Sequence, residues 1–141
     1  MMSRFARFAR FVRRNRWRLI SLAIIVPLGF LTKIYSGPAS DWVQNSLGGV
    51  LYVIFWSLLF SIPFSSSASW KIALIVLVAT CSLEILQLWH PPFLEQIRST
   101  FLGHALMGNS FSWKDLVHYF AGFLLSLVLL SLLRNKRLFY S

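Results

Sequence analysis

Residues 70–89 read WKIALIVLVATCSLEILQLW, an apolar run with one basic and one acidic side chain, Lys71 and Glu84. About 20 apolar residues in a helix cross the roughly 30 Å hydrocarbon layer of a bilayer. Three further stretches resemble this run in length and composition, and prolines, glycines or a serine cluster interrupt the chain between them. The sequence therefore predicts an all-α integral membrane bundle, with four transmembrane helices over about 17–35, 46–64, 70–89 and 113–133.

The overall composition also favours a membrane protein. Hydrophobic residues make up 57% of the 141-residue chain and charged residues only 13%, which is too apolar for a soluble domain of this length. The formal net charge of +10 would suit nucleic-acid binding, but the basic residues gather beside the apolar stretches and no nucleic-acid-binding motif is present. We therefore expect membrane lipid, and not nucleic acid, as a partner.

The basic residues also indicate the orientation of the helices. Half of the 14 lysines and arginines lie at or before Arg18, and Arg134, Lys136 and Arg137 follow the fourth stretch. Segments rich in Lys and Arg stay cytoplasmic, so we expect a multi-pass protein of the inner (cytoplasmic) membrane with both termini in the cytoplasm. The arm is either a topology signal alone or an amphipathic helix, because arginine and phenylalanine recur every third residue. The predicted organisation is a basic cytoplasmic arm, a four-span membrane domain and a basic cytoplasmic tail, over 1–16, 17–133 and 134–141.

Glu84 is the residue that most needs an explanation, because a carboxylate within a span costs roughly several kcal/mol unless it is paired, protonated or hydrated. Gln87 lies one turn further along the same helical face. On the fourth stretch, Asp115, His118 and Tyr119 form a second polar stripe at helical spacing. Two polar stripes in lipid favour facing each other, so we expect these five side chains to lie at one depth.

A basic residue is the expected partner of Glu84. Arg98 in the third connection is our choice, because a guanidinium can donate two parallel hydrogen bonds to a carboxylate. Lys33, near the end of the first stretch, could serve equally well on depth alone. These side chains predict a polar pocket on the outer side of the membrane. Its predicted ligand-binding residues are Glu84, Gln87, Arg98, Asp115, His118 and Tyr119, and its supporting residues are Lys33, Asp41, Asn45 and His90.

The same residues also have structural interpretations. The polar network could serve only to lock the helices together, and Asp115 could complete a capping box with Ser112 at the start of the fourth helix. The three histidines match no known metal-ligand spacing, so neither a metal nor another cofactor is expected. The connection over 90–112 is long and largely apolar, and we expect part of it to form a short interfacial helix.

Three short segments carry a resemblance to a known family. They read NSLGGVLY over 45–52, EILQLWHPPF over 84–93 and FSWKD over 111–115. In these segments the chain resembles a bacterial membrane family catalogued as domain of unknown function 2809. The resemblance implies a small bacterial membrane protein without an established mechanism.

The chain is also distantly similar to VanZ-like proteins, some of which are associated with glycopeptide resistance. Their core pattern has a Glu-x-x-Gln on one span, then an Arg, then an Asp followed by Asn and Gly on the next. This chain departs from the pattern at Tyr119, where Asn would stand, and in the length of the stretch over 98–115. The residues that can be set on the pattern are Glu84, Gln87, Arg98, Asp115 and Gly122.

The expected function follows from the pocket. The sequence favours a non-enzymatic, cofactor-free membrane protein. We expect its pocket to engage a polar or anionic lipid head group, such as that of a lipid-linked envelope precursor. One alternative is a structural subunit or assembly factor that packs against other membrane protein subunits. A second is a proton-linked transporter that uses Glu84, with His118 as a relay.

Overall fold

The structure is a computed structural model that describes residues 4–108 and 110–139. The first three residues of the predicted arm and the last two of the predicted tail fall outside it. The elements in chain order are α1 (Arg4–Ile34), the π-helical segment η1 (Trp42–Leu47), α2 (Gly48–Ser61), α3 (Ser69–Leu86), α4 (Pro92–Arg98), α5 (Phe101–Met107) and α6 (Trp113–Phe139). All the regular structure in the described residues is helical, which confirms the prediction of an all-α fold.

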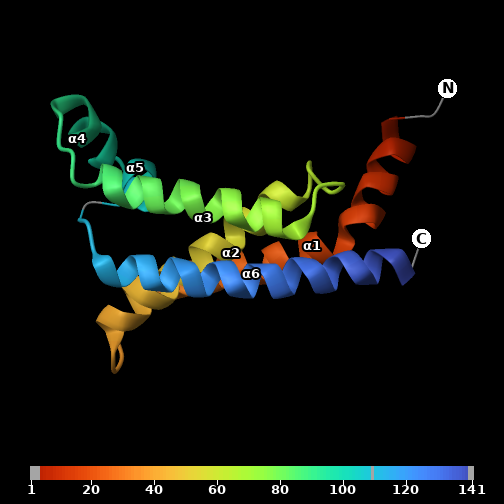
Figure 1. The fold of residues 1–141 in the computed structure, drawn as a ribbon, viewed down its shortest axis with the longest axis horizontal. Coiled ribbons are helices and arrows are strands. Elements are labelled where there is room, and N and C mark those ends of the chain that lie inside the picture. The colour runs from red at the N-terminus through yellow and green to blue at the C-terminus, as the bar shows by residue number, and fades with distance from the viewer. Residues whose placement is uncertain (1–3, 109, 140–141) are drawn as a thin grey trace.

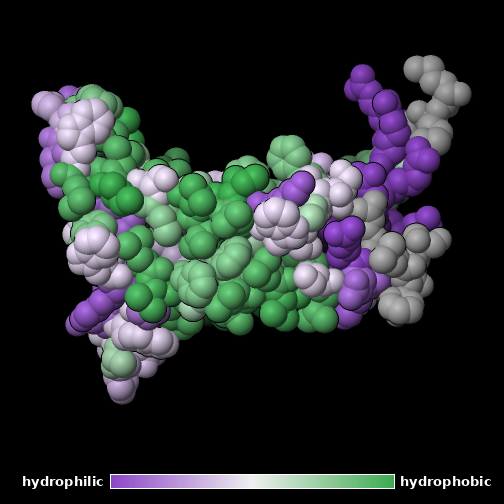
Figure 2. Space-filling model, in the orientation of Figure 1, coloured by the Kyte–Doolittle hydropathy of each residue, from purple (hydrophilic) through white to green (hydrophobic). Residues whose placement is uncertain are grey.

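Four helices are long and apolar enough to cross a membrane. They are α1, the continuous helix formed by η1 and α2, α3, and α6 up to Lys136. Figure 2 shows their apolar surface as a green band between more polar ends. Large side chains such as Ile75 and Val117 are exposed on these helices, as suits a protein whose solvent there is lipid. The chain is thus a multi-pass membrane protein, as its composition predicts.

The bounds of the helices differ from the predicted spans, and the second, for example, runs from Trp42 to Ser61 where 46–64 was predicted. The first helix begins at Arg4, so the basic arm continues directly into the first span; arginine and alanine are good helix formers, and hydropathy alone does not register this. The third helix ends at Leu86, three residues before the predicted boundary. A turn over 87–89 follows it, and the pair Pro91 and Pro92 disfavours a continued helix.

Helix α2 lies at the centre of the bundle, in contact with α1, α3 and α6, and α3 also packs along α6. The buried apolar core consists of Ile54 and Leu58 from α2, Ile72 from α3, and Leu130 and Leu133 from α6. Close approach of α2 and α6 depends on Gly122, where a Cβ would lie 2.9 Å from the carbonyl oxygen of Val50. Small residues allow this spacing between membrane helices.

The two ends of the bundle differ in content. Figure 1 shows the N-terminal turns of α1 and the C-terminal turns of α6 at one end, with the first turns of α1 inclined away from the bundle. Helices α4 and α5 lie at the opposite end, where α4 extends beyond the end of α3 (Figure 1), and they pack against each other. The third connection therefore forms two short helices where the sequence predicted one.

Candidate functional site

The Glu84 carboxylate is satisfied by two hydrogen-bond donors from the last part of the chain. The hydroxyl of Tyr119 on α6 donates to Oε2 of Glu84 at 2.9 Å, and the backbone amide of Ser112 donates to Oε1 at 2.8 Å. Only 1% of Glu84 is exposed. Glu84 of α3 and Tyr119 of α6 therefore face each other, and Glu84 is directed into the bundle.

The contact with Ser112 places Glu84 at the amino end of α6. Helix amino ends carry unpaired N–H groups and a partial positive charge, both of which favour a nearby carboxylate. In the predicted capping box, the carboxylate of Asp115 would accept the amide hydrogen of Ser112. That prediction is wrong, because the amide donates to Glu84. A residue from α3 thus performs the capping that the local sequence assigned to Asp115.

Arg98 does not pair with Glu84, contrary to the sequence prediction. Its Nη2 donates to the carbonyl oxygen of Leu86 at 3.0 Å, and its Nη1 donates to the carbonyl oxygen of Trp89 at 2.9 Å and to Oε1 of Glu95 at 2.8 Å. The side chain is buried, with 3% of Arg98 exposed. The guanidinium therefore binds carbonyl oxygens at and just beyond the end of α3, where the carbonyl of Leu86 also accepts the amide hydrogen of Trp89.

A small charged cluster surrounds Arg98 outside the spans. Nδ1 of His90 lies 2.8 Å from Oε1 of Glu95, and Nη1 of Arg98 lies 3.3 Å from the same ring nitrogen. The hydrogen bonds from His90 and then Arg98 lower the pKa of the Glu95 carboxyl below its ordinary value. Because this carboxyl is exposed to solvent, the pairing fixes α4 to the end of α3 only weakly.

A cavity of about 350 Å³ lies beside Glu84, between the spans and α5. Its walls contain carboxylates, amides and phenol groups, together with glycines and apolar side chains. The polar and charged residues that line it are Lys33, Asn45, Tyr52, Thr80, Glu84, Gln87, His104, Ser110, Asp115 and Tyr119. Its size falls within the range of small-ligand sites, and its polar groups converge from α1, the continuous helix of η1 and α2, α3, α5 and α6, together with the segments that follow α3 and α5.

Gln87 lines this cavity and carries one unpaired polar atom. Its Nε2 donates to the carbonyl oxygen of Met107 at 2.5 Å, whereas its buried Oε1 has no hydrogen-bond partner among the described residues. Next to this bond, Gly108 has a φ of +64°, and a Cβ there would lie 2.7 Å from Nε2 of Gln87. Glycine therefore allows the chain after α5 to pass close to Gln87.

The end of α5 is also held against α2. The hydroxyl of Tyr52 donates to the carbonyl oxygen of Leu106 at 3.0 Å. Together with the bond from Gln87 to Met107, this contact holds the last turn of α5 beside the cavity. The third connection thus forms part of the cavity wall.

The structure brings together most, but not all, of the predicted pocket residues. Glu84, Gln87, Asp115 and Tyr119 line the cavity, as do the supporting residues Lys33 and Asn45. Two other predicted ligand-binding residues and two supporting residues lie elsewhere among the described residues. These four are Arg98, His118, Asp41 and His90.

The positions of His118 and Lys33 have simple explanations. Nδ1 of His118 lies 2.6 Å from the carbonyl oxygen of Lys114, and its ring packs edge-on against Trp42 at a centroid distance of 6.4 Å. Nζ of Lys33 donates to the carbonyl oxygen of Gln44 at 3.0 Å. These contacts serve the helix ends at this side of the bundle, and the lysine also reaches the cavity wall.

The predicted site residues did not include the polar cavity residues Tyr52, Thr80, His104 and Ser110, or the Ser112 amide that binds Glu84. Tyr52 and Ser112 stand within the segments that carry the family resemblance, which is the one signal that could have indicated them. The role of Ser112 comes from its backbone amide, which no residue pattern reveals. Within the described residues, no three His, Cys, Asp or Glu side chains come close enough to hold a metal ion.

Comparison with known proteins gives a family but no relative of known structure. No solved structure matches the chain. A family model described as "Protein of unknown function (DUF2809)" matches residues 39–123, which contain the Glu84 contacts and all of the polar cavity residues except Lys33. The match covers more than half of the chain, and the protein therefore belongs to the DUF2809 family.

Proposed function

We propose that this protein binds the polar head group of a membrane lipid, or of a lipid-linked molecule, in the cavity beside Glu84. The cavity lies at the end of the bundle opposite to both chain termini. If the basic termini are cytoplasmic, as their charge predicts, the cavity opens on the outer side of the membrane. A head group at this level would be within reach of all its polar residues.

The buried acceptor of Gln87 is the observation that carries the proposal. A buried acceptor without a partner costs roughly 1 to 3 kcal/mol, and Oε1 of Gln87 is such an acceptor, in a residue that lines the cavity. The carboxylate of Asp115 adds a further acceptor to the wall, against Lys33 as the one lysine among the described lining residues. A head group rich in hydrogen-bond donors, such as an ethanolamine ammonium or sugar hydroxyls, would complement this wall.

The charges of the cavity refine the ligand class expected from the sequence. The sequence prediction allowed an anionic head group because it placed Arg98 in the pocket. Arg98 lies at the end of α3, so Lys33 remains as the lysine or arginine on the cavity wall among the described residues. A neutral or zwitterionic head group with donors therefore suits the cavity better than a highly anionic one.

A direct test compares lipids that differ in head-group donors. The full chain in neutral detergent is titrated with phosphatidylethanolamine, with a glucosyl diacylglycerol and with phosphatidylcholine, which has no head-group donor. Bound lipid is counted by native mass spectrometry. We expect the first two lipids to bind about tenfold more tightly than phosphatidylcholine, which corresponds to about one or two additional hydrogen bonds.

Gln87→Leu removes the acceptor and is compared with Gln96→Leu, a change at an exposed glutamine on α4 outside the cavity. We expect Gln87→Leu to abolish the preference for donor-bearing lipids and Gln96→Leu to preserve it. Equal binding of all three lipids, or an equal effect of the two variants, would contradict the proposal. In that case the Glu84 network only joins helices, and stoichiometric copurification with other membrane proteins would support a subunit role.

A further inference from the structure

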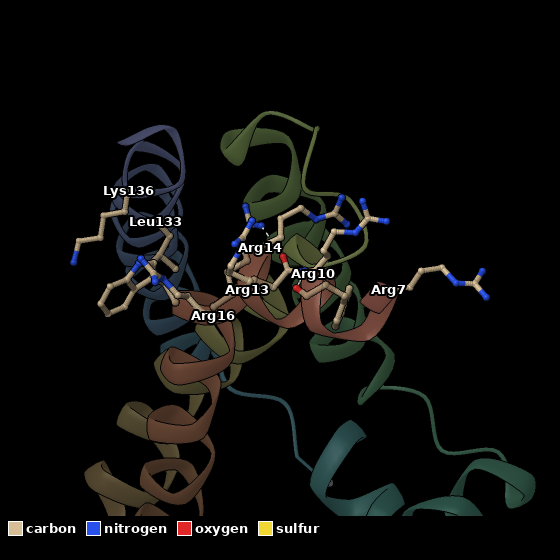
Figure 3. A pocket seen from close by; sticks show the side chains of 11 residues that line it. Arg7, Arg10, Arg13, Arg14, Arg16, Leu133 and Lys136 are labelled. Atoms are coloured by element: carbon tan, nitrogen blue, oxygen red, sulfur yellow. Dashed lines mark hydrogen bonds between the residues drawn. The ribbon is translucent and has the colours of Figure 1, made fainter. Parts of the chain in front are cut away.

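A second cavity lies at the opposite end of the bundle, where both termini are. It has a volume of about 840 Å³ and lies between the first turns of α1 and the end of α6. Figure 3 shows Arg10, Arg13 and Arg14 grouped together, Leu133 and Lys136 of α6 across from them, and Arg7 reaching away to one side. We call this cavity, lined by residues 7, 10, 11, 13–18, 133 and 136, the basic cleft.

The charge of the basic cleft is entirely positive. The charged residues of its described lining are six arginines from α1 and Lys136 from α6, with no aspartate or glutamate. Like charges brought together in one cleft repel each other, and an anion relieves this repulsion. Guanidinium groups can donate paired hydrogen bonds to phosphate oxygens. The chemistry of the cleft therefore matches a phosphate group.

The cleft lies at the level where the helices leave the apolar part of the bundle. Trp17 lines it, with Nζ of Lys136 4.7 Å and Cζ of Arg16 5.3 Å from the centre of its ring system. Tryptophan favours the membrane–water interface, where lipid phosphates also lie. The side chains of Phe11 and Leu133 give the cleft apolar walls as well. This combination fits the head group and first acyl carbons of a lipid better than a free ion.

Two buried groups show that the cleft is a built feature of the fold. Asn15 and Arg18 are 1% and 6% exposed, and Nη1 of Arg18 donates to Oδ1 of Asn15 at 3.1 Å. The amide of Asn15 in turn donates to the carbonyl oxygen of Phe11 at 3.2 Å. The indole Nε1 of Trp17 is buried and has no hydrogen-bond partner among the described residues.

We propose that the basic cleft binds the phosphate group of an anionic membrane lipid. The inference is independent of the head-group cavity at the other end of the protein. All residues of the cleft also lie outside the residues 39–123 that match the family model. The basic cleft would therefore be a second lipid site of this chain, separate from the cavity beside Glu84.

Phosphatidic acid tests the proposal, because its head group is a phosphate alone. The full chain in neutral detergent is titrated with phosphatidic acid and with phosphatidylcholine, and bound lipid is counted by native mass spectrometry. We expect phosphatidic acid to bind about tenfold or more tightly, since each basic residue near a membrane surface contributes on the order of fivefold to attraction of anionic lipid. Equal affinities for the two lipids would overturn the proposal.

A pair of double variants separates a site from general positive charge. Arg14→Gln with Lys136→Gln removes two cations from the cleft, whereas Arg4→Gln with Arg134→Gln removes two exposed cations from the same helices outside it. We expect the first pair to weaken phosphatidic acid binding by about tenfold and the second by less than about threefold. Equal losses would mean that net charge alone attracts the lipid, and the site would be rejected.

Two further measurements complete the test. Lys136→Gln alone, at an exposed position near the end of α6, covers the case in which the double variant fails to fold; we expect about a threefold loss of affinity. Free inorganic phosphate is then added as a competitor. If about 1 mM phosphate displaced the lipid, a soluble anion would be the better ligand, and the lipid assignment would be wrong.

Discussion

The hydroxyl of Tyr119 donates a 2.9 Å hydrogen bond to the buried carboxylate of Glu84 and so joins the fourth span to the third. A cation would be the usual partner for an acid at this depth. Here the carboxylate is instead satisfied by a phenol, by the amide of Ser112 and by the amino end of α6. The site thus keeps an acidic group inside the bundle without a salt bridge among the described residues.

Tyr119→Phe keeps the ring beside Gly49 but removes the hydroxyl. We expect the free energy of unfolding to fall by about 1 to 2 kcal/mol, because Oε2 of Glu84 loses its donor. The measurement is reversible denaturation in mixed micelles. Tyr35→Phe is the control, since its hydroxyl bonds the carbonyl oxygen of Pro38 at an exposed site, and a change within about 0.5 kcal/mol is expected there. Similar values for both variants would contradict this account.

Gly122→Ala tests the close contact of α2 and α6. The added Cβ would lie 2.9 Å from both the carbonyl oxygen of Val50 and Cβ of Val53, so the helices must separate. We expect a loss of about 1 to 3 kcal/mol in stability, measured by the same denaturation. Gly29→Ala on α1 is the matched control, because a Cβ there meets no atom within 4 Å. No difference between the two variants would show that α6 can shift freely against α2.

Arg98→Ala tests the cap on α3. It leaves the carbonyl groups of Leu86 and Trp89 and the carboxylate of Glu95 without the guanidinium. We expect a loss of about 2 to 3 kcal/mol, because the side chain is buried and its bonds are charge-assisted. Gln96→Ala, at an exposed position on the same short helix, should change stability by less than about 0.5 kcal/mol. If Arg98→Ala instead left stability unchanged and weakened lipid binding, the result would contradict the cap and favour the pairing of Arg98 with Glu84 that the sequence predicted.

Glu95 is expected to titrate below its ordinary pKa, chiefly through the hydrogen bond with His90 and next through that with Arg98. A carboxyl with a lower pKa in the folded state stabilises the fold above its unfolded pKa, and the stabilisation disappears as the pH falls through the folded value. The attachment of α4 should therefore weaken on the acid side. Carbon-13 NMR of a selectively labelled Glu95 measures the midpoint.

The His90→Ala variant supplies the comparison for this titration. In this variant the titration midpoint of Glu95 should rise towards its ordinary pKa. The rise should be larger than in Arg98→Met, because the hydrogen bond with His90 is the larger cause of the lowered pKa. Asp41→Asn, at an exposed carboxyl outside the cluster, should leave the midpoint of Glu95 in place. If Glu95 in the unmodified protein titrated at its ordinary pKa, the hydrogen bonds with His90 and Arg98 would not contribute to the attachment of α4.

The sequence predicted the spans well because hydrophobic length is a local property that the bilayer imposes. It also predicted that Glu84 and Tyr119 would face each other, since helical spacing fixes which residues share a stripe. The boundary at Leu86 was less accessible, because the turn after it depends on the bonds that Arg98 donates. Hydropathy contains no information about such bonds.

The partner of Glu84 was mispredicted for a related reason. Charge alone favoured Arg98, but the carbonyl groups at the end of α3 compete for the same guanidinium, and these are present in every helix whatever its sequence. The amide of Ser112 is likewise a backbone group. A prediction that compares only side chains therefore overlooks both the donor that Glu84 finds and the acceptors that Arg98 finds.

The bond between Ser112 and Glu84 joins residues 28 positions apart, and this separation bears on how the protein is made. Until the last apolar segment leaves the ribosome, Glu84 in the third span lacks the amide of Ser112 and the hydroxyl of Tyr119, which donate to its carboxylate in the folded protein. Pairing of the third and fourth spans gives the carboxylate of Glu84 its donors and the amide of Ser112 its acceptor. We therefore expect the translocon to release the third and fourth spans into the bilayer together as a helical hairpin.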